Sequence, residues 1–570
     1  MESGTLTDRK LPGVALGKPP DESEVDPTRV PIHVYKPTNG DGFLSNLRRR
    51  LLGKPRDAPA PYADDDITPI PSMPPGAELV EMHAVRPPFA YVRILYIPEK
   101  SAHHYEVIEP PLGPDEQSAY AFVKDAFLRT LDVDIDALDR RGAREYLAEK
   151  LTHLLTRHDL TLSPLARVRL SYYLERDFLG YGPIDAMMRD GGIEDISCDG
   201  PNVPLFIFHR KYESVRSNLM FPDDIALDGF VMQLVQRCGK HISVAEPLVD
   251  ASLPEGSRLQ ASLSREVTTR GSTFTIRKFR RDPFTPTDLI GFETASPEMV
   301  AYLWLAVEHG ASGLICGGTA SGKTTTLNAL STFIPGRKKI VSIEDTRELN
   351  LAHENWIPGV TRVGGAGGLD ALGKRTGEVD MFDLLKAALR QRPEYLLLGE
   401  VRGQEAYVLF QAMATGHTVY STMHADSVAS AVHRLESRPI EIPRNMLANL
   451  DLVVIQGEIR VDDKRTRKIR ELIEITGIDP RTGEILTNRV YHWDSAEQRF
   501  RYSGSSALLA RVAGEMHVGE VGLRKEMERR VRVLNALHRK GIRDIASFSR
   551  AVSRYAIAPE ELLAEIEAVA

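Results

Sequence analysis

A glycine-rich run near the middle of the 570-residue chain has the residue types and spacing that bind phosphate. The run comprises Gly317, Gly318, Thr319, Ala320, Ser321, Gly322, Lys323 and Thr324. It follows the apolar segment 313–316 and leads into a helix-favouring segment that begins at Thr325. Such a loop lets backbone N–H groups and a lysine hold phosphates while the last hydroxyl coordinates Mg²⁺. The run therefore predicts a binding site for a nucleoside triphosphate, with ATP and Mg²⁺ as ligands.

Carboxylates at the ends of two predicted strands could activate water near a bound triphosphate. Glu400 follows the apolar segment 395–398 and is our candidate for the general base and, with Thr324, for a ligand of Mg²⁺. An ion pair between Glu400 and Arg402 is the alternative. Glu344 ends an earlier strand and is a candidate second carboxylate for water or metal, although adjacent acids also suit a polar turn. We expect Asp345 to be a structural hydrogen-bond acceptor.

Two histidines flank the apolar segment 418–423. Residues an odd number apart on a strand point to opposite faces, so His417 and His424 should not share a metal ion. His424, at the carboxyl end, could hydrogen-bond a γ phosphate, whereas a structural role for His417 is as plausible as a functional one. P-loop hydrolases often use an arginine to stabilise the charge that develops on the phosphates during hydrolysis. Arg258 and Arg277 are candidates, but their spacing alone favours surface ion pairs.

The composition is that of a multidomain globular protein, with 42% hydrophobic and 26% charged residues. The formal net charge of -7 argues against a general nucleic-acid-binding surface. Three scattered cysteines, Cys198, Cys238 and Cys316, fit neither a disulfide framework nor a zinc cluster and predict a reducing cytoplasm. The sequence contains no apolar run of about 20 residues, so we expect membrane contact only through a partner.

The pattern along the chain predicts five regions. They are a mostly disordered arm (1–84), an N-terminal α+β domain (85–285), a linker or hinge (286–289), an ATPase core (290–480) and a C-terminal α+β or helical extension (481–570). Strands and helices alternate through the core, which predicts a doubly wound parallel sheet and an α/β fold class. The arm contains one segment, 43–52, that suits a short basic amphipathic helix or a solvated charge run.

Four segments together resemble the secretion-superfamily ATPases of type II and type IV secretion, type IV pili and the archaellum. They are the phosphate loop 317–324, the acidic box 343–348, the Walker B-like segment 396–403 and the histidine box 416–425. The resemblance spans about residues 172–472 and implies a RecA-like P-loop core. It also implies catalytic roles for Glu400, Glu344, His417 and His424, and it implies that Arg258 and Arg277 reach the nucleotide from the preceding domain.

The resemblance further implies a cytoplasmic homohexamer that hydrolyses ATP to move an integral membrane platform protein of a pilus, archaellum or secretion system. Segments 193–200 and 377–403 resemble the archaeal branch, and three cysteines cannot build the tetracysteine zinc site of many bacterial relatives. We expect no nucleic-acid partner. Two alternatives stay open: a RecA-like nucleic-acid translocase, which the negative charge disfavours, and a non-hydrolysing P-loop regulator.

Overall fold

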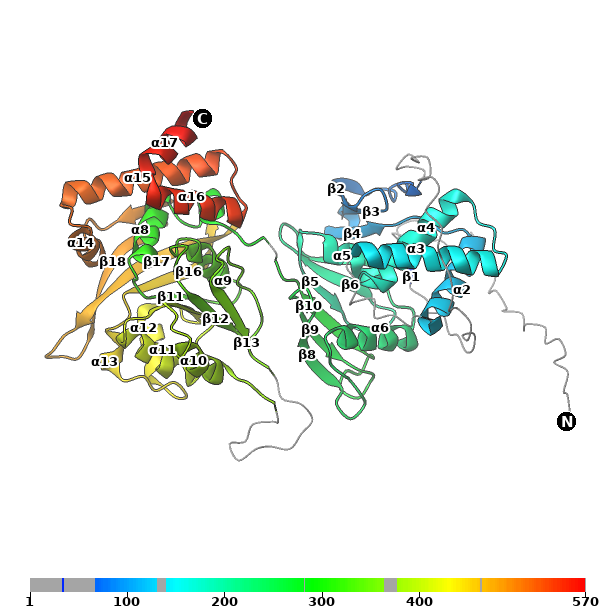
Figure 1. Ribbon diagram of the computed structural model, residues 1–570, viewed down its shortest axis with the longest axis horizontal. Coiled ribbons are helices and arrows are strands. Elements are labelled where there is room, and N and C mark those ends of the chain that lie inside the picture. The colour runs from blue at the N-terminus through cyan, green and yellow to red at the C-terminus, as the bar shows by residue number, and fades with distance from the viewer. Residues whose placement is uncertain are drawn as a thin grey trace. The chain divides into compact units, whose positions relative to one another are not determined.

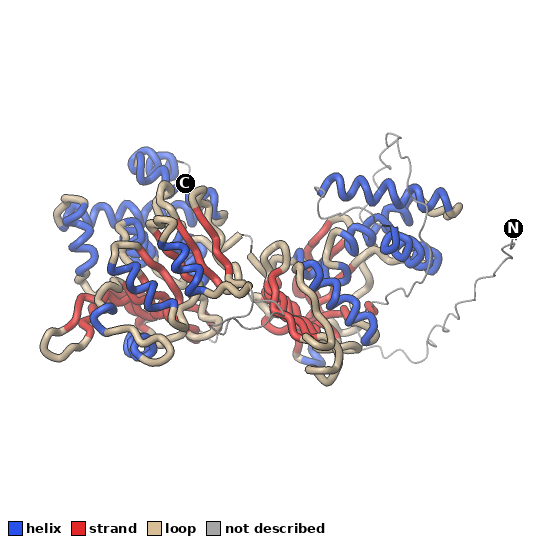
Figure 2. Tube along the Cα trace, turned by 60° about the horizontal axis from the view of Figure 1, so that its bottom comes forward, coloured by secondary structure: helices blue, strands red, loops and turns tan. Residues whose placement is uncertain are grey.

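The computed structural model describes residues 33–34, 67–130, 140–280, 282–362, 377–461 and 464–568. The chain divides into two compact units, Met1–Lys278 and Phe279–Ala570 (Figure 1). In each unit the strands gather into a sheet with helices packed around it (Figure 2). The basic helix proposed at 43–52 lies outside the described residues, as does most of the predicted arm.

The first unit is built on a ten-stranded sheet with the order β2-β3-β4-β7-β6-β5-β10-β9-β8, and β1 pairs with β7 outside this path. Neighbouring strands are antiparallel except that β1 and β4 run parallel to β7. The strands are β1 (His33–Val34), β2 (Glu78–Arg86), β3 (Ala90–Ile97), β4 (Ala102–Ile108), β5 (Ile193–Cys198), β6 (Pro204–His209), β7 (Glu213–Met220), β8 (Leu248–Ser252), β9 (Arg258–Ser262) and β10 (Thr273–Arg277).

Ordered structure begins earlier than the sequence predicted. Strand β2 lies almost wholly inside the segment expected to be disordered, and it pairs with β3 along nearly its whole length. Its side chains are partly or fully exposed because it is an edge strand, so its sequence lacks the apolar alternation of a half-buried strand. Thr68 is also buried, and its hydroxyl donates to the Phe89 carbonyl at 3.0 Å.

The helices of the first unit begin where side chains cap them. Ser163 Oγ accepts a hydrogen bond from the Ala166 N–H at the start of α4, and Asp223 Oδ1 accepts one from the Ala226 N–H at the start of α6. The latter cap fixes the start of α6 at Asp224. The helices are α2 (Pro114–Thr130), α3 (Arg140–Arg157), α4 (Pro164–Phe178), α5 (Asp185–Arg189) and α6 (Asp224–Arg237).

The second unit contains a nine-stranded sheet with the order β13-β12-β14-β15-β11-β16-β17-β18-β19. The strands from β13 to β16 are parallel, as predicted, and β17 to β19 continue the same sheet in antiparallel pairs. The strands are β11 (Gly313–Gly317), β12 (Ile340–Glu344), β13 (Trp356–Val360), β14 (Tyr395–Leu398), β15 (Thr418–Met423), β16 (Leu452–Val461), β17 (Lys464–Ile478), β18 (Ile485–Asp494) and β19 (Arg499–Tyr502).

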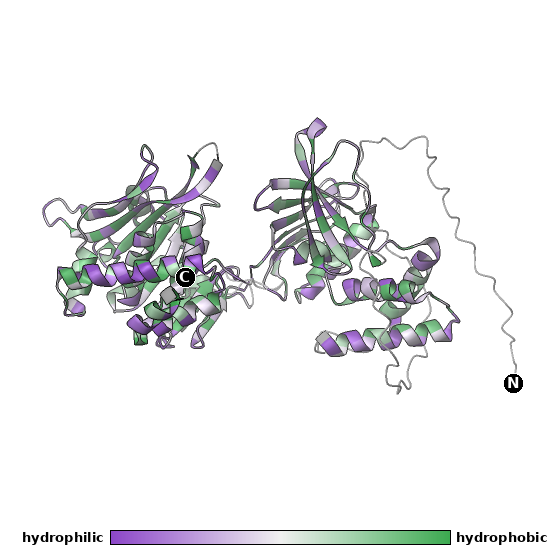
Figure 3. Cartoon of the chain, turned by 90° about the horizontal axis from the view of Figure 1, so that it is seen from above, coloured by the Kyte–Doolittle hydropathy of each residue, from purple (hydrophilic) through white to green (hydrophobic). Residues whose placement is uncertain are grey.

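Helices cover both faces of this sheet, so its parallel strands are apolar on both sides. On β11, Ile315 joins the core formed with α8, α9 and α14 to α17, whereas Leu314 and Cys316 join the core formed with α10 to α13. The helices carry hydrophilic and hydrophobic residues side by side, as amphipathic packing requires (Figure 3). They are α7 (Pro286–Gly291), α8 (Pro297–Glu308), α9 (Lys323–Ser331), α10 (Met381–Leu389), α11 (Glu405–Ala414), α12 (Val428–Glu436), α13 (Arg444–Leu447), α14 (Ala507–Glu515), α15 (Glu520–Arg539), α16 (Ile545–Ile557) and α17 (Pro559–Ala568).

Two predicted boundaries differ from the structure. Residues 286–289 are not a linker: they open helix α7, where Asp288 Oδ2 accepts a hydrogen bond from the Thr285 N–H at 2.9 Å, and the two units instead divide between Lys278 and Phe279. Residues 481–570, predicted as a C-terminal α+β or helical extension, contain β18, β19 and α14 to α17, and these helices share one core with α8 and α9 of the predicted ATPase core. Local composition could not reveal this, since the contacts join segments about 200 residues apart.

Candidate functional site

The phosphate loop connects β11 to α9 and has a tightly closed backbone. Gly322 caps α9 with a φ of +94°, and Ala320 has a φ of +59°, so the loop contains two left-handed residues. The Lys323 ammonium donates to the Gly318 carbonyl at 2.8 Å, and the Ser321 hydroxyl donates to the same carbonyl at 2.9 Å. This loop leaves backbone N–H groups at the N-terminus of α9 for an anion.

The remaining loop residues surround this cradle. Thr319 is exposed, whereas Thr324 and Thr325 lie half-buried in the first turn of α9. Thr324 therefore occupies the position that suits an oxygen ligand of Mg²⁺ beside the phosphates. Among the described residues, no group of three or more His, Cys, Asp or Glu side chains is arranged to hold a metal ion by itself.

Gln456 on β16 contacts the phosphate loop and the first turn of α9, and the sequence analysis did not identify this residue. Its backbone lies opposite Gly317 in the β11–β16 pair, and its side chain is buried, with 3% exposed. Thr326 donates its hydroxyl to Gln456 Oε1 at 2.8 Å, while Gln456 Nε2 lies 2.9 Å from where a Cβ on Gly322 would be. The amide thus joins α9 to the sheet and fills the space that a side chain at Gly322 would need.

Three predicted residues converge at the carboxyl ends of β11, β14 and β15. His424 Nδ1 lies 3.5 Å from the Lys323 ammonium, and His424 Nε2 lies 3.5 Å from Glu400 Oε1. Burial lowers the pKa of Lys323, and the nearby Glu400 opposes that shift. Burial and then the Lys323 charge lower the pKa of His424 below its usual 6.5, so this imidazole is neutral at neutral pH.

Glu344 is almost completely buried at the end of β12, beside the peptide that precedes Glu400. Its Oε1 accepts hydrogen bonds from the Glu348 and Leu349 N–H groups at 2.9 and 3.0 Å, whereas its Oε2 is buried with no hydrogen-bond partner in the described part of the chain. A Cβ on Gly399 would lie 3.3 Å from Glu344 Cγ. Burial raises the pKa of Glu344 to about 7, although the two N–H groups oppose this.

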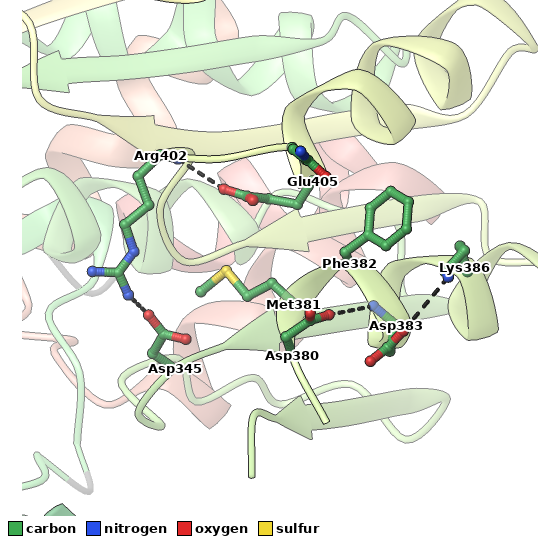
Figure 4. A pocket seen from close by; sticks show the side chains of 9 residues that line it. Asp345, Asp380, Met381, Phe382, Asp383, Lys386, Arg402 and Glu405 are labelled. Atoms are coloured by element: carbon green, nitrogen blue, oxygen red, sulfur yellow. Dashed lines mark hydrogen bonds and ion pairs between the residues drawn. The ribbon is translucent and has the colours of Figure 1, made fainter. Parts of the chain in front are cut away.

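Arg402 pairs with Asp345, not with Glu400 as the alternative reading proposed. Asp345 also accepts a hydrogen bond from the Thr361 hydroxyl at 3.1 Å, which fits the structural role expected of it. This ion pair lines a pocket of about 520 Å³ on the second unit (Figure 4). The pocket is lined by Asp345, Asp380, Met381, Phe382, Asp383, Lys386, Arg402, Gln404 and Glu405.

His417 does not lie with this cluster. It precedes β15 at the amino end of the strand, where its Nδ1 lies 3.1 Å from the Thr415 hydroxyl and 3.2 Å from the Ala412 carbonyl, against the end of α11. Arg258 and Arg277 lie in the first unit, opposite each other on β9 and β10. Arg258 pairs with Asp250, and Arg277 lies opposite Asp195 on β5.

Comparison with known proteins identifies the family of most of the chain. A family model described as "Type II/IV secretion system protein" matches residues 182–551, and a model described as "PilB3-like, N-terminal" matches residues 56–111. The protein MJ0900 of Methanocaldococcus jannaschii is 37% identical over 391 residues, which are 68% of this chain and 69% of that protein. MJ1287 of the same organism is 45% identical over 252 residues, covering 44% of this chain and 91% of that protein.

Bacterial relatives are similar over a shorter part of the chain. The type IV secretion system protein PtlH of Bordetella pertussis is 38% identical over 223 residues, 35% of this chain and 63% of PtlH. Among solved structures, the VirB11 ATPase of the Brucella suis type IV secretion system is 25% identical with a TM-score of 0.26, covering 50% of this chain and 92% of VirB11. The pilus retraction motor PilT with bound ADP is 17% identical with a TM-score of 0.35, covering 66% and 93%.

Proposed function

The chain belongs to the type II/IV secretion system protein family, and from this premise we propose that it binds MgATP on the 317–324 loop and hydrolyses it. The observation that carries the proposal is the meeting of Lys323, His424 and Glu400 at the carboxyl ends of adjacent parallel strands. Ligands of open α/β sheets bind at this edge. The family membership supports an ATPase, and the site residues supply the chemistry.

Each residue has a defined task in this proposal. Backbone N–H groups of the loop and the Lys323 ammonium hold the β and γ phosphates, and Lys323 exchanges its bond to the Gly318 carbonyl for phosphate oxygens. Glu400 orients the attacking water and accepts its proton. His424 is neutral, and because its Nδ1 faces the Lys323 ammonium, its single N–H lies on Nε2 beside Glu400. We propose that this N–H turns from Glu400 to a γ-phosphate oxygen and responds when that group leaves. Mg²⁺, held by Thr324 and Glu400, would neutralise charge on the phosphates.

Glu344 is a second carboxylate in this proposal, and its buried position limits what it can do. Its Oε1 is occupied by two backbone N–H groups, which leaves Oε2 to receive a proton or a hydrogen bond. A carboxyl with a pKa of about 7 changes charge near neutral pH. We propose that Glu344 steadies the Gly399–Glu400 peptide and can exchange a proton with the water that Glu400 activates.

We propose further that the protein works as a cytoplasmic homohexamer on an integral membrane platform protein of a pilus, an archaellum or a secretion system. Arg258 and Arg277 are proposed to complete the charge around the nucleotide. The similarity to archaeal and secretion-system proteins supports this assignment. None of the described helices is both long enough and apolar enough to cross a bilayer.

Replacing Glu400 by Gln tests the hydrolytic assignment. The variant should still bind MgATP, because the Gln amide oxygen can remain a ligand of Mg²⁺, and it should lose about 10²- to 10⁴-fold in turnover, because a general base typically contributes that factor. Nucleotide binding and phosphate release would be measured on the full-length chain. A parental hydrolysis rate in this variant would exclude Glu400 as the base.

Glu394 provides the matched control. It lies immediately before β14, at the opposite end of the strand from Glu400, and pairs with Lys338 on the surface. Glu394→Gln makes the same chemical change without touching the phosphate loop. Its turnover should therefore equal that of the parent, and an equal loss in both variants would point to damage to the strand instead of loss of a base.

A further inference from the structure

Strand β17 brings a cation to the phosphate loop from outside all four sequence motifs. The Cδ of Arg467 lies 3.7 Å from the position that a Cβ on Gly322 would occupy, so the alkyl chain of this arginine passes beside the cap of α9. Arg467 lies opposite Glu458 in the β16–β17 pair. Since Glu458 is two residues after Gln456 on β16, the side chains of Gln456, Glu458 and Arg467 lie on the same face of the sheet. The side chain is exposed, and it can reach into solvent at the loop.

The guanidinium of Arg467 has no acidic partner in the described part of the chain. Glu458, the acid directly across the strand pair, lies 3.5 Å from Arg465 and forms its ion pair there. Arg467 is thus an uncompensated cation beside Gly322, at the positive N-terminal end of α9. The positive end of the helix repels this cation, and an anion bound at the loop would relieve the repulsion.

The order of the strands tells which part of an anionic nucleotide would meet Arg467. In the proposed function, Lys323, His424 and Glu400 surround the terminal phosphate, and the two latter residues follow β15 and β14 on one side of β11. Strands β16 and β17 lie on the other side of β11. With the γ phosphate on the first side, as the proposed function has it, the α phosphate and nucleoside would extend toward the second. We propose that Arg467 binds the α-phosphate end of a nucleoside di- or triphosphate, an inference that rests on the proposed function.

A contact to the α phosphate predicts a distinct kinetic signature. ATP, ADP and the transition state all contain this group, so losing the contact weakens all of them equally. Removing it should raise KM and leave kcat unchanged, unlike removal of Glu400. Because an arginine presents a planar fork of donors, a lysine at 467 should restore only part of the affinity.

The test replaces Arg467 by Met, which keeps the alkyl chain beside Gly322 and removes the charge. Dissociation constants for MgADP and MgATP, together with KM and kcat, are measured on the full chain. We expect both dissociation constants and KM to rise about tenfold, the low end for a charged hydrogen bond because the group is exposed. The difference in dissociation constant between the parent and Arg467→Met should shrink at high salt. The dissociation constants of Arg467→Lys should lie between those of the parent and those of Arg467→Met.

Arg470→Met is the matched control. Arg470 is an exposed arginine of the same strand, but its Cδ lies 2.9 Å from where a Cβ on Gly457 would be, on the opposite face from Gln456. Its nucleotide affinities should match those of the parent. Parental affinities for both nucleotides in Arg467→Met overturn the inference, and so does a loss for MgATP alone, which would assign the arginine to the γ phosphate. A parent that binds no nucleotide would instead refute the proposed function itself.

Discussion

Burial of Glu344 makes the stability of the second unit depend on pH in an unusual direction. The pKa of this carboxyl rises from 4.5 to about 7 in the folded protein, chiefly because burial penalises its charged form. A shift of this size corresponds to roughly 3 kcal/mol. The folded state has its full stability below pH 4.5, where the carboxyl is neutral in both the folded and the unfolded protein. This stability is lost as the pH rises to about 7, because the carboxyl of the unfolded chain releases its proton at a lower pH than the carboxyl of the folded protein.

The substitution Glu344→Gln should remove this dependence. The amide oxygen can still accept from the Glu348 and Leu349 N–H groups, and the uncharged side chain stays neutral at every pH. The variant should therefore gain up to roughly 3 kcal/mol over the parent at pH 8 and nothing at pH 4.5. All three tryptophans, Trp304, Trp356 and Trp493, lie in the second unit, so urea unfolding followed by tryptophan fluorescence reports this unit.

Glu474 supplies a control of opposite sign. Glu474 is also buried, and burial by itself would raise its pKa. Hydrogen bonds from Ser506, Asn488, Tyr302 and the Ala507 N–H outweigh this effect and hold the pKa of Glu474 below 4.5. Its contribution is present above pH 4.5 and lost in acid, so Glu474→Gln should lower stability at neutral pH. If the parent and Glu344→Gln lose stability equally between pH 5 and pH 8, the carboxylate at 344 is not held neutral and the reasoning fails.

Four further substitutions test the site around the phosphate loop. Gln456→Leu removes the acceptor of the buried Thr326 hydroxyl, which should destabilise the second unit by about 1–3 kcal/mol in urea unfolding. Gly322→Ala forces a Cβ to within 2.9 Å of the Gln456 amide at a φ of +94°, so MgATP binding should be lost in equilibrium titration. His424→Ala should reduce steady-state turnover, whereas His417→Ala should leave it unchanged, because only His424 lies within 3.5 Å of Lys323. Equal effects of the two histidine changes would contradict this placement.

The sequence by itself determined the parts that depend on neighbouring residues. The glycine-rich loop, the acids at strand ends and the alternation of apolar segments with helices predicted the parallel sheet of the second unit and the cluster of Lys323, Glu400 and His424. These signals are local because a phosphate loop needs fixed spacing and because parallel strands end at one edge of the sheet.

Only the tertiary structure decided which distant segments meet. The pairing of β16 with β11 brings Gln456 under the loop from 130 residues beyond Thr326, and β17 then brings Arg467 beside Gly322. Neither residue belongs to a motif with fixed spacing. The same holds for helices α14 to α17, whose place in one core with α8 followed from buried contacts instead of local composition. Strand pairing and core packing depend on complementary shape and hydrogen bonding between distant segments. The order of residues within one segment does not specify which distant segment it will contact.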